Sequence, residues 1–229
     1  MNKYLTVAKV NFKKSTWIAY LVAGISVLAM ITDLIVDVCL NNNTDSSIST
    51  YSLLYLICIL APILIASVNY SKFMNIGVNK KTYFYGCMIN YVVFAAIVSV
   101  LGVLGHYLMD TRLVENEVYE EVLSLIGVFG WDSSVFTAFF SQFAFLLLVE
   151  VVIHTLTFMQ AKWYGWVTDV LIITIISVFT PISALRQVEV FFFRFIIFEQ
   201  PIIQIPVCLG LSILFYYTNL FYLKNRNNG

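Results

Sequence analysis

Residues 70–82 read YSKFMNIGVNKKT and form a short polar interruption between two long apolar runs. The stretch contains Lys72, Lys80 and Lys81, and Gly77 lies near its centre. The apolar runs on either side are each near the length of about 20 residues that a helix needs to cross the hydrocarbon core of a bilayer. The stretch therefore predicts a short helix and a turn that connect two membrane-spanning helices, and Gly77 can adopt the left-handed cap that ends the short helix.

The composition also indicates a membrane protein. Of the 229 residues, 60% are hydrophobic and only 11% are charged, whereas a soluble domain has about 25% charged residues. A core of this size could not hide so much apolar surface from water, so the bilayer is the expected solvent. The net charge is zero, which gives no electrostatic case for a nucleic-acid partner.

Six continuous apolar runs predict an all-α integral membrane protein, with residues 1–229 as a single transmembrane domain. The runs do not alternate between apolar and polar residues as the strands of a membrane barrel do. The predicted spans cover approximately residues 17–40, 51–70, 82–109, 134–160, 166–183 and 201–223.

Lysine and arginine orient these spans, because cytoplasmic loops carry an excess of basic residues. With the N-terminus inside, ten of the 13 basic residues fall in cytoplasmic segments, and the exceptions are Arg112, Arg186 and Arg194. The reverse orientation would invert this excess. Both termini and residues 70–82 are therefore expected in the cytoplasm of a multi-pass protein of the cell membrane.

Three segments outside the spans carry predictions of their own. Residues 1–16 separate lysines from apolar residues around a helix, which is typical of an amphipathic interfacial helix, and the alternative is a frayed tail. Residues 184–200 are too charged to span and too aromatic for water, so they predict an external re-entrant segment. Residues 110–133 predict one external amphipathic helix, which ends in the membrane-seeking pair Phe129 and Trp131.

The chain lacks the motifs of several enzyme classes. It has no GxxxxGK[ST] phosphate loop and no HExxH zinc motif, and its four cysteines are too far apart for a metal site or a disulfide framework. Glu120 and Glu121 resemble the paired acids of some intramembrane proteases, but Leu125 stands where an arginine is expected. Neither an enzyme nor a cofactor held by this chain is expected.

Two ionisable residues, Glu150 and His154, lie inside the fourth predicted span and share a helix face at a spacing of four. Charge inside a membrane is costly and usually faces protein or a wet cavity. The pair therefore predicts either the lining of a translocation path or a packing contact between helices, and two ligands are too few for a metal site. Asp33 and Asp37 repeat the spacing in the first span, either on the same path or simply exposed at the interface.

The whole arrangement resembles the permease subunits of type-2 ABC exporters: an amphipathic N-terminal helix, six spans, both ends inside and an aromatic re-entrant segment before the last span. The local motif is FMNIGVNKK, residues 73–81. In small bacterial permeases of this family the loop often reads G-[VI]-S-R-[KR]. Here Asn79 stands for the serine and Lys80 for the arginine, which keeps polarity and charge but loses the guanidinium fork.

The resemblance implies that residues 70–82 form a coupling segment that docks into a separately encoded ATPase, which would bind ATP and magnesium. It further implies a second permease subunit, identical or not, in a bacterial membrane, and export of amphipathic, antimicrobial or toxin peptides. Other readings are a plain basic loop in a non-transporting protein that sequesters a peptide or anchors a complex, and less readily a membrane hydrolase. The residues expected to contact the ATPase are Phe73, Met74, Ile76, Gly77, Asn79, Lys80 and Lys81.

Overall fold

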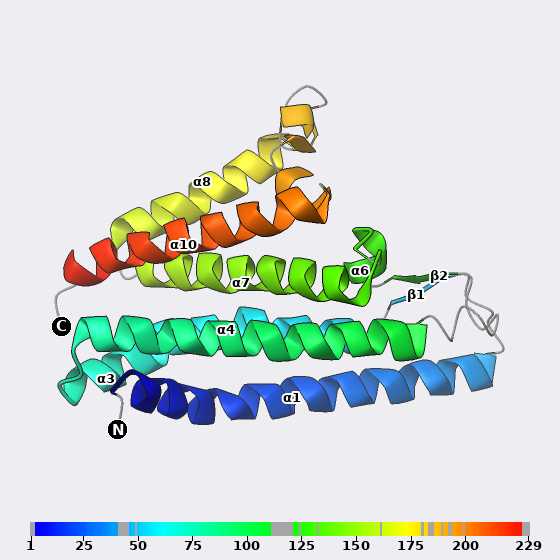
Figure 1. The fold of residues 1–229 in the computed structure, drawn as a ribbon, viewed down its shortest axis with the longest axis horizontal. Helices are drawn as coiled ribbons and strands as arrows, with labels where there is room; N and C mark the ends of the chain where they lie inside the picture. The colour runs from blue at the N-terminus through cyan, green and yellow to red at the C-terminus, as the bar shows by residue number, and fades with distance from the viewer. Residues whose placement is uncertain are drawn as a thin grey trace.

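The computed structural model describes residues 3–40, 46–48, 50–110, 121–123, 125–131, 133–160, 162–179, 181–182, 186–188, 190–191, 194–198 and 200–225. These residues are almost all helical and form a layered bundle of long helices (Figure 1). The α-helices are α1 Lys3–Leu40, α2 Leu56–Leu64, α3 Tyr70–Asn75, α4 Lys80–Gly105, α6 Leu125–Val128, α7 Val135–Met159, α8 Trp163–Phe179 and α10 Pro201–Asn225. A 3₁₀ turn, η1 (Thr50–Tyr55), precedes α2, and the π-helical turns are η2 (Ile65–Asn69), η3 (His106–Asp110) and η4 (Arg194–Phe198).

Four helical stretches are long and apolar enough to cross a membrane, which confirms the expected helical membrane fold in outline. They are Tyr51–Asn75, Lys80–Leu108, Val135–Met159 and Pro201–Leu220. Each coincides with a predicted span. The other two predicted spans fall on α1 and on α8, whose apolar stretch Trp163–Ile175 is shorter.

The first helix differs from the prediction of a separate interfacial helix over residues 1–16. α1 continues without a break from Lys3 to Leu40, because neither glycine nor proline occurs before Gly24 and the buried face runs on through Ile18 and Val22. The apolar side of its first turns lies against α4. At the closest approach, a Cβ added to Gly86 would lie 2.6 Å from Val7 Cγ1.

The core is built around α7, which lies between α10 on one side and α4 with α2 on the other (Figure 1). Leu147 and Val151 belong to the main buried cluster shared with α2 and α4, while Ala144 and Leu148 pack with Cys208 of α10. A helix that is covered on several sides can carry apolar residues all round, which explains why α7 has no single apolar face and why its few polar side chains, such as Gln142, Glu150 and His154, are also buried.

Two segments that are distant in sequence pair in a way that the sequence did not predict. β1 (Ser46–Ile48) and β2 (Glu121–Leu123) are parallel and hydrogen-bonded, and α6 is only four residues long. The single amphipathic helix predicted for residues 110–133 is therefore wrong. Trp131 is completely buried rather than inserted into a membrane surface, because it packs against Ile126 and the outer ends of α4 and α7. Six of the residues 184–200 lie outside the described part of the chain, and the others include the π-helical turn η4. The re-entrant segment therefore stays a prediction.

Candidate functional site

The segment 70–82 is a helix followed by a tight, hydrogen-bonded turn. The amide N–H of Gly77 donates to the carbonyl of Met74 at 3.0 Å, and that of Val78 donates to the carbonyl of Phe73 at 3.0 Å. Gly77 has a φ of 78°, a left-handed conformation that glycine adopts without the clash of a Cβ. This is a Schellman motif, and it confirms the predicted left-handed cap at Gly77.

α4 begins almost immediately after that cap. Asn79 is its N-cap: its backbone is extended, and its side chain accepts a hydrogen bond from the N–H of Lys81 at 3.0 Å. Asparagine is among the favoured N-cap residues, so residue 79 ends the turn and starts α4. Only residues 76–79 separate the two helices, and both ends of the connection are fixed by hydrogen bonds.

The apolar docking face predicted from Phe73, Met74 and Ile76 is divided by the fold. Phe73 is only 5% exposed, because its ring packs against Tyr83 with centroids 5.6 Å apart. Met74 is partly buried against the same cluster. Ile76, by contrast, is 74% exposed at the tip of the turn. Phe73 is therefore a core residue, and Ile76 is the apolar side chain that remains accessible to a partner.

A pattern in the sequence before Phe73 indicates that this residue is buried. Ala66, Asn69, Tyr70 and Phe73 follow one another at spacings of three, one and three, and all four are buried. A helical stripe of this kind runs from the span into α3, so residue 73 continues the packed face of the preceding helix.

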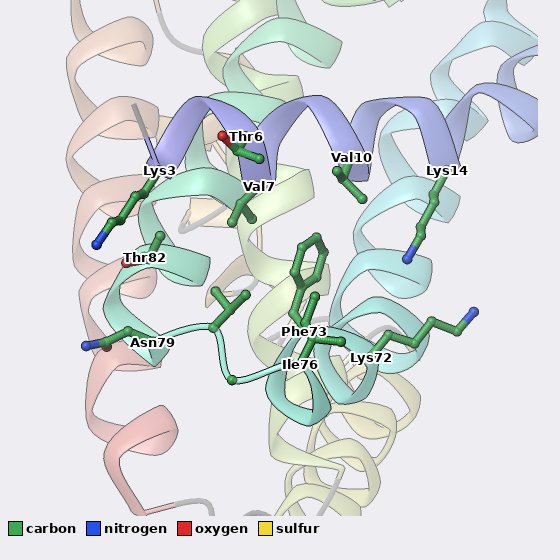
Figure 2. A pocket seen from close by; sticks show the side chains of 12 residues that line it. Lys3, Thr6, Val7, Val10, Lys14, Lys72, Phe73, Ile76, Asn79 and Thr82 are labelled. Carbon is green, nitrogen blue, oxygen red and sulfur yellow. The ribbon is translucent and has the colours of Figure 1, made fainter. Parts of the chain in front are cut away.

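A pocket separates this segment from the start of α1, and we refer to it as the α1–α3 pocket. It is a cavity of about 660 Å³ between the first turns of α1 and the turn after α3 (Figure 2). The sequence analysis missed it, because the two walls are distant in sequence. Its lining residues are Lys3, Thr6, Val7, Val10, Lys14, Lys72, Phe73, Ile76, Gly77, Val78, Asn79 and Thr82.

Glu150 and His154 both lie in the protein interior, as their shared helix face indicated. His154 is 1% exposed and Glu150 is completely buried. The Nδ1 atom of His154 is hydrogen-bonded to the hydroxyl of Tyr91. The Glu150 carboxylate lies beside the Cys58 thiol, but neither of its oxygens has a hydrogen-bond partner of ordinary geometry among the described residues.

The other two residues predicted to line a path are Asp33 and Asp37 of the first span. The side chains of Asp33 and Asp37 lie outside the described part of α1, so their role stays a prediction. Further polar contacts join the helices, including Asn219 Nδ2 to Thr155 Oγ1 at 2.9 Å and Gln142 Nε2 to the hydroxyl of Tyr55 at 2.7 Å. Such contacts hold helices together inside a membrane, which is a sufficient role for the His154–Tyr91 pair as well.

Comparison with known proteins gives no match: no protein-family model, curated protein or solved structure is similar to this chain. Among the residues that the structure describes, no group of three or more His, Cys, Asp or Glu side chains is placed to hold a metal ion. Two features of the structure are therefore candidates for a functional role: the capped turn at residues 76–79 and the buried cluster around Glu150.

Proposed function

We propose that this chain is the membrane subunit of an ATP-driven exporter, with six spans and both termini in the cytoplasm. The observation that carries the proposal is the exposed Ile76 on a turn that is fixed at both ends. The turn lies at the end of the bundle where α1 begins and α10 ends (Figure 1). A rigid, exposed apolar tip at the end of a membrane bundle is suited to docking into a groove on a soluble partner.

The partner's chemistry follows from the residues around that tip. Lys72 and Lys81 are exposed close to Ile76, so a complementary surface would be an apolar groove with acidic groups at its rim. A separately encoded ATPase would supply that groove and would bind ATP and magnesium itself. Because Phe73 anchors the turn in the core, a displacement of the tip would be passed to the helices as a rigid-body movement.

The cargo proposed for this exporter is an amphipathic peptide, such as an antimicrobial peptide or toxin, moved by a dimer of permease subunits in a bacterial membrane. Glu150, His154, Asp33 and Asp37 are the residues proposed to line its path. A second candidate is a non-transporting membrane protein that sequesters a peptide or anchors a complex. The complete burial of Glu150 and His154 favours this alternative, since side chains along an open path would have exposed surface.

Purification with the ATPase of a neighbouring reading frame tests the proposal. The chain and the ATPase are co-expressed, extracted in detergent and reconstituted, and the ATPase rate is measured with and without the chain. Wild-type chain should co-purify with the ATPase and stimulate it, and Ile76→Asp should abolish both effects. Asn75→Asp is the matched control, because it adds the same charge at an exposed neighbouring position. If the wild-type chain neither binds nor stimulates the ATPase, the transporter proposal fails.

A further inference from the structure

Three lysines surround the α1–α3 pocket and give it a cationic rim. Lys3 and Lys14 are eleven residues apart on α1, about three helical turns, so they lie on the same side of that helix. Lys72 comes from α3 on the opposite wall (Figure 2). The Nζ atom of Lys14 lies 5.4 Å from the centre of the Phe73 ring, which joins the two walls through a cation–π contact.

The charge of this rim is not balanced within the described part of the chain. No carboxylate there forms an ion pair with Lys3, Lys14 or Lys72. An anion that enters the opening would therefore be attracted by cationic side chains from both walls of the pocket. The pocket wall between the lysines is mostly apolar. Its apolar side chains are Val7, Val10, Phe73, Ile76 and Val78, and its polar ones are Thr6, Asn79 and Thr82. The pocket thus combines cationic and apolar surface, which suits an anionic amphiphile better than a free ion.

An exposed apolar stripe leads away from the pocket along the same side of α1. It begins three residues after Lys14, continues with helical spacing and borders the buried face that Ile18 and Val22 continue. The four side chains are between 44% and 65% exposed, and they are Trp17, Leu21, Ile25 and Leu28. A stripe of this length and spacing can lie along a lipid acyl chain. The indole of Trp17 follows directly after the lysines, at the depth where tryptophan meets lipid headgroups.

We propose that the α1–α3 pocket binds the phosphate headgroup of an anionic phospholipid, with an acyl chain along the stripe of α1. Lysine and arginine excess places this end of the bundle in the cytoplasmic leaflet, which carries anionic lipid. The bound lipid connects Lys14 of α1 to Lys72 of α3 and so holds the turn at residues 76–79 in a fixed position relative to α1. Lipid binding at this site requires a membrane but no ATPase. It can therefore be tested independently of the proposed transport function.

Native mass spectrometry of the detergent-extracted full chain tests the proposal. Phosphatidylglycerol and phosphatidylcholine are offered in equal amounts, and the lipid retained per chain is counted. The test variant is Lys3→Gln/Lys14→Gln/Lys72→Gln. The control variant is Lys9→Gln/Lys13→Gln/Lys81→Gln. It also removes three positive charges from the same end of the bundle, but these three lysines do not line the pocket. Circular dichroism checks that both variants remain helical. If the triple variant is poorly folded, the single variant Lys72→Gln replaces it in the test, because Lys72 is exposed.

Wild-type chain should retain phosphatidylglycerol over phosphatidylcholine. The pocket variant should lose that retention by at least about tenfold, and Lys72→Gln alone by about fivefold, because each lysine that lines the pocket loses its attraction to the bound anionic headgroup. The control should retain lipid as the wild type does. Equal losses in pocket and control variants would overturn the proposal. Displacement of the lipid by millimolar inorganic phosphate would reassign the pocket to free phosphate, and displacement by a hexaglutamate peptide would reassign it to an acidic protein segment.

Discussion

The side-chain amide of Asn69 donates a hydrogen bond of 3.0 Å to the side-chain oxygen of Asn11. Both residues are buried, and Nδ2 of Asn11 in turn lies 3.6 Å from the Cys87 sulfur. The contact therefore joins α1, the π-helical turn η2 and α4 at one point. Since Asn69 directly precedes α3, this contact fixes where the segment 70–82 begins relative to the first helix.

Replacing either asparagine should destabilise the bundle. Asn11→Leu should lower the free energy of unfolding by about 1–3 kcal/mol, because it leaves the buried amide of Asn69 without an acceptor. The double variant Asn11→Leu/Asn69→Leu should cost less than the sum of the single changes, since it removes both partners. Chemical unfolding in detergent measures these values, with the exposed Lys9→Ala as control. Strict additivity would show that the hydrogen bond contributes nothing.

The effect of substituting Gly77 on stability should depend only on how well the new residue adopts the left-handed backbone conformation. Gly77→Ala should cost about 1–2 kcal/mol because alanine is strained at a φ of 78°, and no neighbouring atom lies within 4 Å of the added Cβ. Gly77→Asn should cost less, because asparagine tolerates the left-handed region. Gly24→Ala, in the middle of α1 and equally open, should instead stabilise by up to about 1 kcal/mol. Thermal unfolding measures all three, and an equal loss for alanine and asparagine at residue 77 would contradict the backbone explanation.

Substitution of Phe73 should affect mainly the stability of the fold, whereas substitution of Ile76 should affect mainly the docking of a partner. Phe73→Ala should lower the free energy of unfolding by about 3–5 kcal/mol, because it removes a buried ring from the core. Ile76→Ala should change it by no more than about 0.5 kcal/mol, as is usual for an exposed side chain, while weakening stimulation of a bound ATPase. Unfolding and ATPase rates are measured on the same preparations. Loss of stimulation by Phe73→Ala with unchanged stability would return Phe73 to the docking surface.

Substitutions of Glu150 and of Tyr91 should have different effects on thermal stability. Glu150→Gln should leave the melting temperature unchanged or raise it, because an amide of the same shape replaces a carboxyl group that has no hydrogen-bond partner among the described residues. Tyr91→Phe should lower stability by about 1–3 kcal/mol, since it leaves the buried His154 Nδ1 unpaired. Scanning calorimetry distinguishes the two. If Glu150→Gln is destabilising, its contact with Cys58 holds the helices together, and the carboxylate has a packing role rather than a place on a path.

The sequence predicted those features that depend on neighbours along the chain. The apolar runs located the helices, glycine at position 77 predicted the cap, and the spacing of Glu150 and His154 predicted their common face. What it did not predict depends on contacts between distant segments. An amphipathic pattern in residues 1–16 identifies a face but not what covers it, and α4 proved to be the cover. The parallel pairing of Ser46–Ile48 with Glu121–Leu123 leaves no local pattern.

The continuity of α1 has a mechanical consequence. A helix of 38 residues is about 57 Å long, nearly twice the thickness of about 30 Å of a bilayer's hydrocarbon core. Inside a membrane, such a helix must tilt or project beyond the lipid. Its hydrogen-bonded backbone has no proline at which to bend. A tilt imposed on one end of α1 therefore swings its other end, so this single helix acts as a lever along the whole length of the bundle (Figure 1).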